Sequence, residues 1–552
     1  MLPGVVQVVL LFRVVAATVS RSQQHLSTEG VASNQVSEYS TPPLSTIQRF
    51  MKMLEPRAAD EQRVLKRAQL SVANVTCNDG SPAGFYLRRS QTSTKWIIFL
   101  EGGWYCYDER SCHNRWMRLR HLMTSKQWAD TKTVGGILSA NPEENPFWWD
   151  ANHVFVPYCS SDSWSGSRTR PGGDVRFSFM GAAIVRQVVQ DLLPLGLRNA
   201  TSLLLAGSSA GGTGVIVNLD PVTELLHRQL GLRGIAVRGA SDSGWFLDRA
   251  PYSRDARLLS PTEAVRRGLE LWQGRVSPHC HHRYPAEPWR CYFGYRSYPT
   301  LTAPLFVFQW LFDEAQMAAD NVGAPVTKQQ WDYIHKMGDS LRNSFQNVSA
   351  VFAASCISHT VLTKKEWLQV RINEVSLPQA LHCWEQQPYQ AQLSLMRAGT
   401  PERLAVPMLG DEPPAAQSLQ RMSYRTNATS APGSRHDRRR RRRKKHNGNR
   451  NKNRPERNRG KKKKGRKGSR RREQRSVQCQ YRHVERCSWP QCNHSCPKLH
   501  NPFTGEEMDF IELLKSFGLD MASVANALGI DIHTLNNMDH EELLTLLTQQ
   551  AN

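Results

Sequence analysis

The chain has 552 residues and a formal net charge of +24 at pH 7. Almost all of this charge lies in residues 435–475, where 24 Lys and Arg oppose three acidic residues, a net +21 that leaves +3 for the rest. This distribution excludes a fold that is basic over its whole surface, and the length allows one large domain with additional segments.

The N-terminal segment has the character of an export signal. Residues 1–20 are mostly Val, Leu and Ala and end in small residues, although Arg13 interrupts the apolar run. The run is too short to span a membrane, and no other stretch of about 18 apolar residues follows. We therefore expect a secreted protein without a membrane span, in which the polar residues 21–70 form a partly disordered pro-region.

Cysteines and glycosylation motifs favour the same compartment. The chain has 12 Cys and no Cys-x-x-Cys redox pair, and an even set in an exported protein is typical of disulfides. We expect the local pairs Cys106–Cys112, Cys280–Cys291 and Cys356–Cys383, although sequence alone does not fix connectivity. Five Asn-x-Ser/Thr motifs are predicted glycosylation sites: Asn74, Asn199, Asn347, Asn427 and Asn493.

Two groups of His and Cys raise the question of a metal site. One is residues 277–282 with Cys291, and the other comprises Cys479, Cys487, Cys492 and Cys496 with His483 and His494. Neither group matches a familiar zinc-ligand spacing, and exported cysteines are usually oxidised. We therefore expect no metal ion and no cofactor.

Apolar runs alternate with segments that are long enough for helices, such as residues 181–193. The runs lie at residues 96–100, 154–157, 203–206, 235–237 and 305–310. This alternation predicts an α/β fold with a mainly parallel central sheet covered by helices, over residues 71–387. A first hairpin is expected between residues 75–77 and 85–87, with a turn at residues 78–80.

The most informative stretch is Leu-Leu-Leu-Ala-Gly-Ser-Ser-Ala-Gly-Gly at residues 203–212. An apolar run passes through Gly-x-Ser-x-Gly into a helix-compatible run, which is the strand–turn–helix setting of a nucleophile elbow. The tight turn needs small flanking residues, and Gly207 and Gly211 meet that need. Ser209 is therefore the predicted nucleophile, at a helix N-terminus that favours negative charge. An ordinary glycine-rich turn is the alternative.

A second glycine-containing turn follows the apolar run at residues 96–100. Gly102 and Gly103 would let backbone N–H groups turn toward the site, where α/β-hydrolases build half of their oxyanion hole. The predicted donors are Gly103 or Trp104, together with the N–H of Ala210 after the nucleophile. A simple turn at the end of a strand is the alternative.

The acid and the base should follow the nucleophile in that order. Asp313 ends the apolar run that begins at residue 305 and is the predicted acid, with Glu314 as the alternative. His359 follows the next apolar run and is the predicted base, which would take the proton from Ser209 while Asp313 fixes its tautomer. Asp242 also follows a predicted strand and is a rival for the acid.

Several longer motifs contain these residues: Leu-Glu-Gly-Gly-Trp-Tyr-Cys (100–106), Gly-Ser-Ser-Ala-Gly-Gly (207–212), Ser-Asp-Ser-Gly-Trp-Phe (241–246), Gln-Trp-Leu-Phe-Asp-Glu-Ala-Gln (309–316), Ser-His (358–359) and Leu-His-Cys-Trp (381–384). Together they resemble the Notum family, secreted carboxylesterases of the pectin acetylesterase-like group of α/β-hydrolases. The resemblance covers about residues 49–384 and resumes from about Cys487. It implies hydrolysis of the palmitoleate ester on a serine of Wnt proteins, which ends Wnt signalling.

The resemblance also implies roles for individual residues. It places the triad on Ser209, Asp313 and His359 and the oxyanion donors on Gly103, Trp104 and Ala210. It further implies a deep apolar pocket for the acyl chain, with matching positions at Trp104, Tyr105, Phe246, Tyr292 and Phe293. Each buried methylene contributes about 0.8 kcal/mol, so a long chain would supply most of the binding energy. Without the resemblance, these aromatic residues would be assigned to the core.

Residues 388–478 lie outside the resemblance and are rich in Pro, Ser, Asn and basic residues, with an unbroken basic run at 438–445. This composition predicts a disordered insert. It lacks the interleaved aromatic residues that stack on bases, so we do not expect nucleic acid as a partner. Heparan sulfate is the expected partner of an exported polycation, and the resemblance implies association with heparan sulfate and glypicans. A solvated linker is the alternative.

The last segment, residues 479–552, contains four Cys and apolar residues at helical spacing, which predict short helices packed on the catalytic domain. Two other functions stay open for the whole chain. One is an acetylesterase that acts on polysaccharide, and the other is an inactive hydrolase-fold protein that binds heparan sulfate. The depth of the acyl pocket would separate an acetylesterase from a palmitoleoyl esterase, whereas an intact triad argues against an inactive protein.

Overall fold

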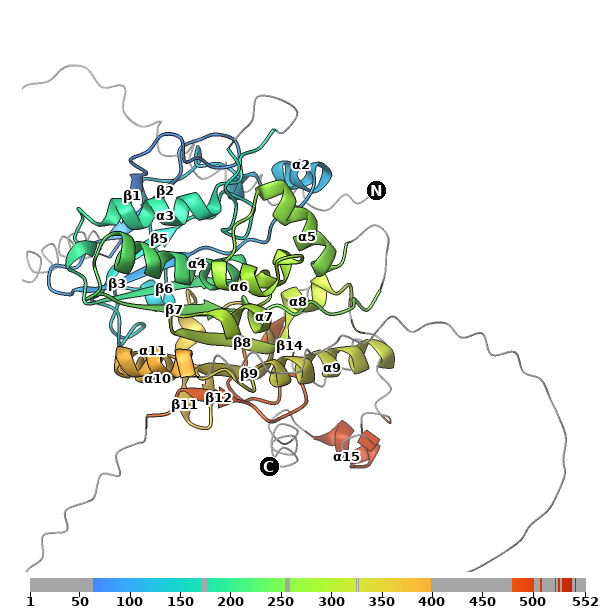
Figure 1. The fold of residues 1–552 in the computed structure, drawn as a ribbon. Coiled ribbons are helices and arrows are strands. Elements are labelled where there is room, and N and C mark those ends of the chain that lie inside the picture. Colours follow the sequence, from blue (N-terminus) through green and yellow to red (C-terminus); the bar gives the residue numbers. More distant parts are fainter. Residues whose placement is uncertain are drawn as a thin grey trace, which may run out of the picture. The chain divides into compact units, whose positions relative to one another are not determined.

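Ten strands form one mixed sheet in this computed structural model. The structure describes residues 63–169, 176–253, 259–323, 325, 327–398, 479–500, 507–508, 522, 525–526, 529–538 and 542. In spatial order the strands are β12 (Arg482–Val484), β9 (Val351–Ser358), β8 (Leu305–Asp313), β7 (Ala236–Asp242), β6 (Ser202–Ser208), β3 (Lys95–Leu100), β5 (Asn152–Val156), β2 (Gly84–Arg88), β1 (Leu65–Gln69) and β4 (Thr131–Lys132). Neighbours from β12 to β5 pair in parallel, and the remaining pairs are antiparallel (Figure 1).

Helices connect the parallel strands, as alternation of the two elements requires. The connecting helices among the described residues are α2 (Glu109–Arg118), α3 (Gly181–Leu192), α4 (Ala210–Glu224), α5 (Pro261–Trp272), α6 (Pro278–Arg283), α7 (Gly294–Ser297), α8 (Glu314–Ala319), α9 (Lys328–Ser344), α10 (Leu377–Glu385) and α11 (Tyr389–Ala398), and α15 (Ile532–Asn537) follows all the strands. Two small ribbons, β10 (Arg371–Ile372) with β11 (Val375–Ser376) and β13 (Leu499–His500) with β14 (Glu507–Met508), lie outside the main sheet.

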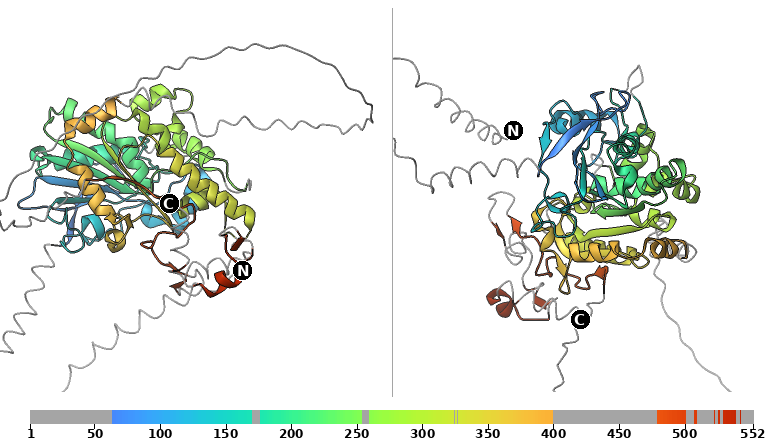
Figure 2. Two further views of the ribbon diagram at one scale, coloured as in Figure 1. Left: turned by 90° about the horizontal axis from the view of Figure 1, so that it is seen from below. Right: turned by 90° about the vertical axis from the view of Figure 1, so that its left-hand side faces the viewer.

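Both faces of the parallel part of the sheet are buried, which explains why its strands are apolar throughout. On one face, Ile98 of β3 belongs to a core that includes Val188 of α3 and Ile334 of α9. On the other face, Phe99 belongs to a core that includes Leu381 of α10. The sheet accordingly lies between α9 and α10 when it is viewed from below (Figure 2). The predicted α/β class and mainly parallel sheet are confirmed.

The N-terminal edge of the sheet differs from the prediction. The expected hairpin is confirmed only at its turn: the chain reverses at residues 78–80 with an antiparallel bridge between Thr76 and Pro82, but residues 85–87 belong to β2, which pairs with β1. A disulfide from Cys77 to Cys159 ties that segment to another loop instead. Strand β1 also begins inside the range that was predicted to be a pro-region. Its exposed face is polar and Leu65 alone is fully buried, so its pattern resembled that of a disordered segment.

Disulfides attach the C-terminal segment to the sheet. The predicted pairs Cys106–Cys112 and Cys280–Cys291 are confirmed, but Cys356–Cys383 is wrong. Cys356 of β9 pairs with Cys496, and Cys383 of α10 pairs with Cys479. Chain proximity suggested the wrong partners, because the chain returns after the insert and adds β12 beside β9.

The remaining domain predictions concern segments of which the structure describes little. Helix α11 occupies the first residues of the predicted insert, and residues 399–478 lie outside the described residues. The predicted signal peptide and residues 21–62 also lie outside them, and α15 is the best described of the expected C-terminal helices. Among the described residues, no helix has the length and apolar character of a membrane span.

Candidate active site

Ser209 stands on a tight turn between β6 and α4. Its backbone has φ 58° and ψ −122°, a left-handed conformation that side-chain-bearing residues seldom adopt. A Cβ atom at Gly211 would lie 2.0 Å from the carbonyl oxygen of Leu100, and one at Gly207 would lie 2.4 Å from the carbonyl oxygen of Gly211. Only glycine therefore fits on either side of Ser209, as the sequence pattern required.

Asp313 and His359 meet at the carboxyl ends of two neighbouring strands. Asp313 ends β8, and His359 follows β9 directly. The imidazole Nδ1 lies 2.9 Å from Asp313 Oδ2. Asp313 has no exposed surface, and its carboxylate also accepts from the backbone N–H of Gln316 and from Gln309 Nε2. These donors hold the carboxylate oriented toward the imidazole.

Several charges set the pKa of His359. Burial is the largest single influence and lowers this pKa, but the carboxylates of Asp313, Asp242 and Glu314 together raise it more, so that the net pKa lies above its ordinary value. Because Nδ1 is bonded to Asp313, Nε2 is the nitrogen that remains for a proton from Ser209. Within the described residues no hydrogen bond joins Ser209 Oγ to the imidazole, and such bonds are often long before substrate binds.

The two alternatives for the acid occupy different places. Asp242, at the end of β7, accepts hydrogen bonds from the hydroxyl of Ser208 and from backbone N–H groups beyond His359, not from the imidazole. Glu314 is the first residue of α8, and its pKa is raised by burial and by neighbouring Asp313. The hydrogen-bonding geometry therefore favours Asp313.

The loop after β3 packs closely against the turn that carries Ser209. A Cβ at Gly102 would lie 2.9 Å from Ser209 Cβ, so the loop backbone approaches the nucleophile closely. Gly103 and Trp104 both have positive φ, 143° and 61°. Ala210 begins α4, so its N–H has no acceptor within the helix. The described residues provide no acceptor for these three N–H groups, which leaves them available to a ligand oxygen.

The five aromatic residues predicted for the acyl pocket line one pocket beside Ala210. Trp104 stacks on Tyr105 with 4.9 Å between ring centroids, and Phe246 meets the edge of Trp104 at 6.0 Å and lies 6.4 Å from the ring of His359. We call this the aromatic pocket. Its free space is only about 20 Å³, and the residues that line it are Trp104, Tyr105, Ser163, Ala210, Thr213, Phe246, Pro261, Val265, Tyr292 and Phe293.

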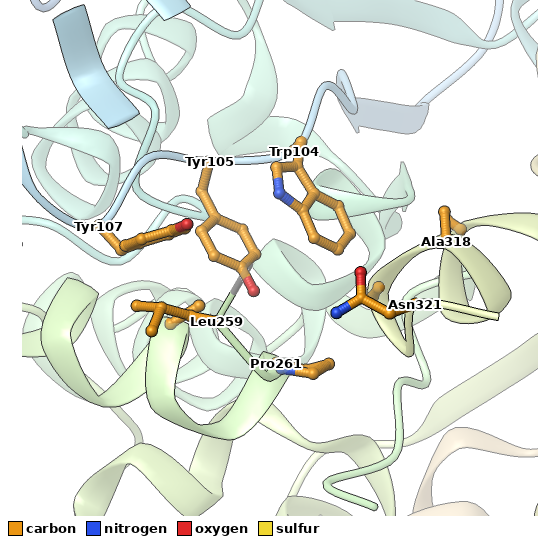
Figure 3. A pocket seen from close by; sticks show the side chains of 10 residues that line it. Trp104, Tyr105, Tyr107, Leu259, Pro261, Ala318 and Asn321 are labelled. Atoms are coloured by element: carbon orange, nitrogen blue, oxygen red, sulfur yellow. The ribbon is translucent and has the colours of Figure 1, made fainter. Parts of the chain in front are cut away.

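A second, larger pocket adjoins the aromatic pocket and shares Trp104, Tyr105 and Pro261 with it. We call it the neighbouring pocket; its volume is about 310 Å³. Figure 3 shows Trp104 and Tyr105 projecting from the loop after β3 toward Pro261 and toward Asn321. Sequence reasoning missed the α5 residues that line both pockets and the α8 residues that line the neighbouring pocket, because nothing in their local pattern separates a pocket lining from an ordinary apolar helix face.

The polar side chains around the two pockets are uncharged or accept hydrogen bonds from neighbouring groups. The Tyr292 hydroxyl donates to Ser165 Oγ, and burial raises the pKa of both Tyr292 and Tyr105. Behind them lies Asp162, which is fully buried and accepts from the N–H groups of Trp164, Gly166 and Gly181. The pocket walls are therefore uncharged.

The structure separates the predicted glycosylation sites. Asn74, Asn199 and Asn347 are exposed, and Asn427 lies outside the described residues. Asn493 is only 8% exposed, and its Nδ2 donates to the carboxylate of Glu485 and to the carbonyl of Arg371. Its buried, hydrogen-bonded amide makes Asn493 less accessible than the three exposed sites, and glycosylation at all five positions stays a prediction.

The two groups of His and Cys that raised the question of a metal site contain oxidised cysteines. Cys280, Cys291 and the four C-terminal cysteines are all in disulfides. In the part of the chain that the structure describes, no group of three His, Cys, Asp or Glu side chains could hold a metal ion.

Comparison with known proteins places this geometry in a family. The pectinacetylesterase family model matches residues 59–397. The palmitoleoyl-protein carboxylesterase NOTUM of Drosophila melanogaster is 47% identical over 598 residues, which covers 90% of this chain and 88% of the relative. The chain belongs to the Notum family of pectinacetylesterases.

Other members of the Notum family also match the chain. The Notum protein of Homo sapiens, named as a palmitoleoyl-protein carboxylesterase, is 38% identical over 504 residues, covering 90% of this chain and 86% of the relative. The solved structure of the Wnt deacylase Notum from Drosophila, crystal form II, matches with a TM-score of 0.57 and 61% identity. The match covers 58% of this chain and 93% of that Notum chain.

Proposed function

We propose that this Notum family member is a carboxylesterase that removes the palmitoleate ester from a serine of Wnt proteins. The observation that carries the proposal is the His359–Asp313 pair, at 2.9 Å, beside the Ser209 elbow and the aromatic pocket. Relatives that align over most of the chain are named palmitoleoyl-protein carboxylesterases, and a solved relative is described as a Wnt deacylase.

The proposed mechanism assigns a role to each residue. Ser209 Oγ attacks the ester carbonyl while His359 Nε2 takes its proton, and Asp313 stabilises the resulting imidazolium. The N–H groups of Gly103 or Trp104, with Ala210, stabilise the oxyanion. His359 then protonates the serine oxygen of Wnt, which leaves as an alcohol. Water activated by His359 hydrolyses the acyl-enzyme and releases the fatty acid.

Binding of a long acyl chain requires the pocket walls to move. About 20 Å³ of free space beside Ala210 is less than the chain needs, whereas the neighbouring pocket provides about 310 Å³. Trp104 and Tyr105 belong to both pockets, so displacement of these stacked rings would join them. In the unmoved state the aromatic pocket suits a small acyl group, and this observation keeps a polysaccharide acetylesterase as the second candidate.

A palmitoleoylated Wnt peptide tests the proposal directly. Purified protein should release palmitoleate from the peptide, measured by mass spectrometry, and the Ser209→Ala variant should not. Ser340→Ala on α9, distant from the site in the chain, is the matched serine control and should match the wild-type protein. Release of acetate from acetylated polysaccharide together with an unchanged lipidated peptide would favour the acetylesterase instead.

We further propose that the protein is secreted and retained by heparan sulfate through residues 435–475. Six disulfides suit an exported protein, and the segment carries +21 of the +24 net charge. Such a polycation binds polyanions mainly by releasing their counterions, so binding depends steeply on salt. Deletion of residues 435–475 should lower the salt needed to elute the protein from heparin and leave turnover of a small soluble ester unchanged. Unchanged elution would place the heparin site on the folded part.

A further inference from the structure

Asp242 lies between the two halves of the proposed site without touching the imidazole. It ends β7, which separates β6, the strand before Ser209, from β8, the strand that ends in Asp313. It has no exposed surface. A buried carboxylate is costly unless it is well bonded, so its partners indicate what it is for.

The bonds of Asp242 reach the nucleophile turn on one side. Its backbone carbonyl accepts from the N–H of Ser209 at 2.8 Å. Its Oδ2 accepts from the hydroxyl of Ser208, the residue before the nucleophile, at 2.5 Å. Two atoms of one residue thus hold the left-handed turn that presents Ser209.

On the other side, the same carboxylate holds the loop that carries His359. Oδ2 accepts from the N–H groups of Val361 and Leu362 at 2.9 and 3.0 Å. Thr360, at φ 56°, donates its N–H to the hydroxyl of Ser243, which in turn donates to Asp242 Oδ1. Three successive N–H groups after His359 are therefore fixed by Asp242 and its neighbour.

We propose that Asp242 is a positioning residue for the esterase reaction. Its carboxylate holds the turn of Ser209 and the loop of His359 in a fixed position relative to each other. This proposal rests on the proposed function of Ser209 and His359. It extends that function, because it assigns the alignment of base and nucleophile to a residue that touches neither substrate nor imidazole.

The charge of Asp242 gives the role a signature in the pH dependence of activity. The charged groups that face His359 are Asp313 at the end of β8, Glu314 on α8 and Asp242 on β7, while Lys364 Nζ donates to the carbonyl of His359. The Asp242 carboxylate raises the pKa of His359. Its loss should lower that pKa and move the acid limb of kcat/KM to lower pH.

Two substitutions separate the bonds of Asp242 from its charge. Asp242→Asn retains an acceptor for the two backbone N–H groups, so it should stay within about tenfold of wild-type kcat and shift the acid limb down by about half a pH unit. Asp242→Ala removes the bonds and should lower kcat about 100-fold, with a much smaller change in KM for a short ester. Partial rescue by Asn relative to Ala is the expected pattern.

Asp220 provides a matched control at the opposite end of the sheet. It is 6% exposed and likewise accepts from two successive backbone N–H groups, those of Thr302 and Ala303, just before β8. Asp220→Asn should leave the acid limb in place, and Asp220→Ala should affect thermal stability more than kcat. Each variant is measured as full-length secreted protein, with circular dichroism to confirm folding.

The outcomes separate this proposal from the proposed function. If Ser209→Ala retains activity, the nucleophile itself is wrong. If Ser209→Ala is inactive but Asp242→Asn has the wild-type acid limb and Asp242→Ala loses no more kcat than Asp220→Ala, only the role of Asp242 is refuted. If Asp242→Ala does not fold, the pH of the acid limb of kcat/KM is compared between Asp242→Asn and Asp220→Asn. A downward shift in Asp242→Asn alone supports the proposal, and equal positions refute it.

Discussion

The two ends of the parallel sheet differ in backbone strain. In the loops that follow β3, β6, β7 and β9, Trp104, Ser209, Ser243 and Thr360 have φ between 52° and 61°. Among the described residues, the segments that lead into these four strands hold no such residue other than glycine. Residues in this region of φ and ψ cost about 1–3 kcal/mol each and persist where the surroundings fix them.

The difference in backbone strain reflects what the loops at the two ends of the strands do. At the amino end the chain only has to turn, and Gly196 and Gly231, at φ 111° and 71°, do so without strain. At the carboxyl end the turns must also present side chains, such as those of Trp104 and Ser209, which glycine would remove. Strain at one end is the cost of placing functional groups there.

The largest effect should come from the strained nucleophile and its base. Ser209→Ala and His359→Ala should each lower turnover of a short ester by several orders of magnitude, because the triad acts as a unit. Melting temperatures should change by only a few degrees. Substantial turnover by Ser209→Ala would show that the strained turn serves some purpose other than catalysis.

A smaller effect should come from the aromatic pocket, which exists only at the carboxyl end. Phe246→Trp fills space beside Trp104 and should lower kcat/KM for long-chain esters at least about tenfold more than for acetyl esters, since each excluded methylene forfeits about 0.8 kcal/mol. The measurement is kcat/KM on both ester classes. Equal losses on both would show that Phe246 does not line the acyl path.

Substitution by glycine should have opposite effects on stability at the two ends. Thr360→Gly removes a β-branched residue from φ 56° and should raise the free energy of unfolding by about 1 kcal/mol while lowering kcat. Thr302→Gly, in the relaxed loop before β8, should lower the free energy of unfolding by about 1 kcal/mol. Chemical denaturation measures both values, and equal destabilisation by the two variants would remove the contrast.

The smallest effect concerns pH. Because the folded pKa of His359 is raised, its contribution to stability is fully present below about pH 6.5 and is lost as the pH rises through the folded value. Activity should change in the opposite direction, because only the neutral imidazole accepts a proton. The stability difference between wild type and His359→Ala should therefore shrink from pH 5.5 to 8.5 as kcat/KM rises. A difference that grows with pH would contradict the raised pKa.

Local motifs made much of the site predictable from sequence. The Gly-x-Ser-x-Gly pattern specifies a turn in which a side chain at Gly207 or Gly211 would clash with the backbone. Asp313 is the last residue of one apolar strand, and His359 directly follows another. Parallel strands bring such ends together at one edge of the sheet, so chain order was sufficient to predict their proximity. The core strands were recognisable for the same reason, since burial on both faces makes them uniformly apolar.

Features that depend on tertiary contacts were not predictable. Cys356 and Cys383 are near in sequence, but each pairs with a segment that returns after the insert. Strand β1 has a polar exposed face because it lies near the edge of the sheet. Asp242 was a plausible acid by position, and only its hydrogen bonds show that it holds the loop of His359. Side-chain direction decided that case, and sequence does not encode it locally.

We claim that the strained end of the sheet is an esterase site for a long acyl chain, and a series of esters of increasing acyl length decides this. Soluble esters from acetyl to palmitoleoyl would be assayed with purified wild type, with Ser209→Ala to subtract background. We expect kcat/KM to rise with chain length, by up to about fourfold per methylene while the chain is being buried. The highest kcat/KM on acetyl esters, falling with length, would contradict the claim.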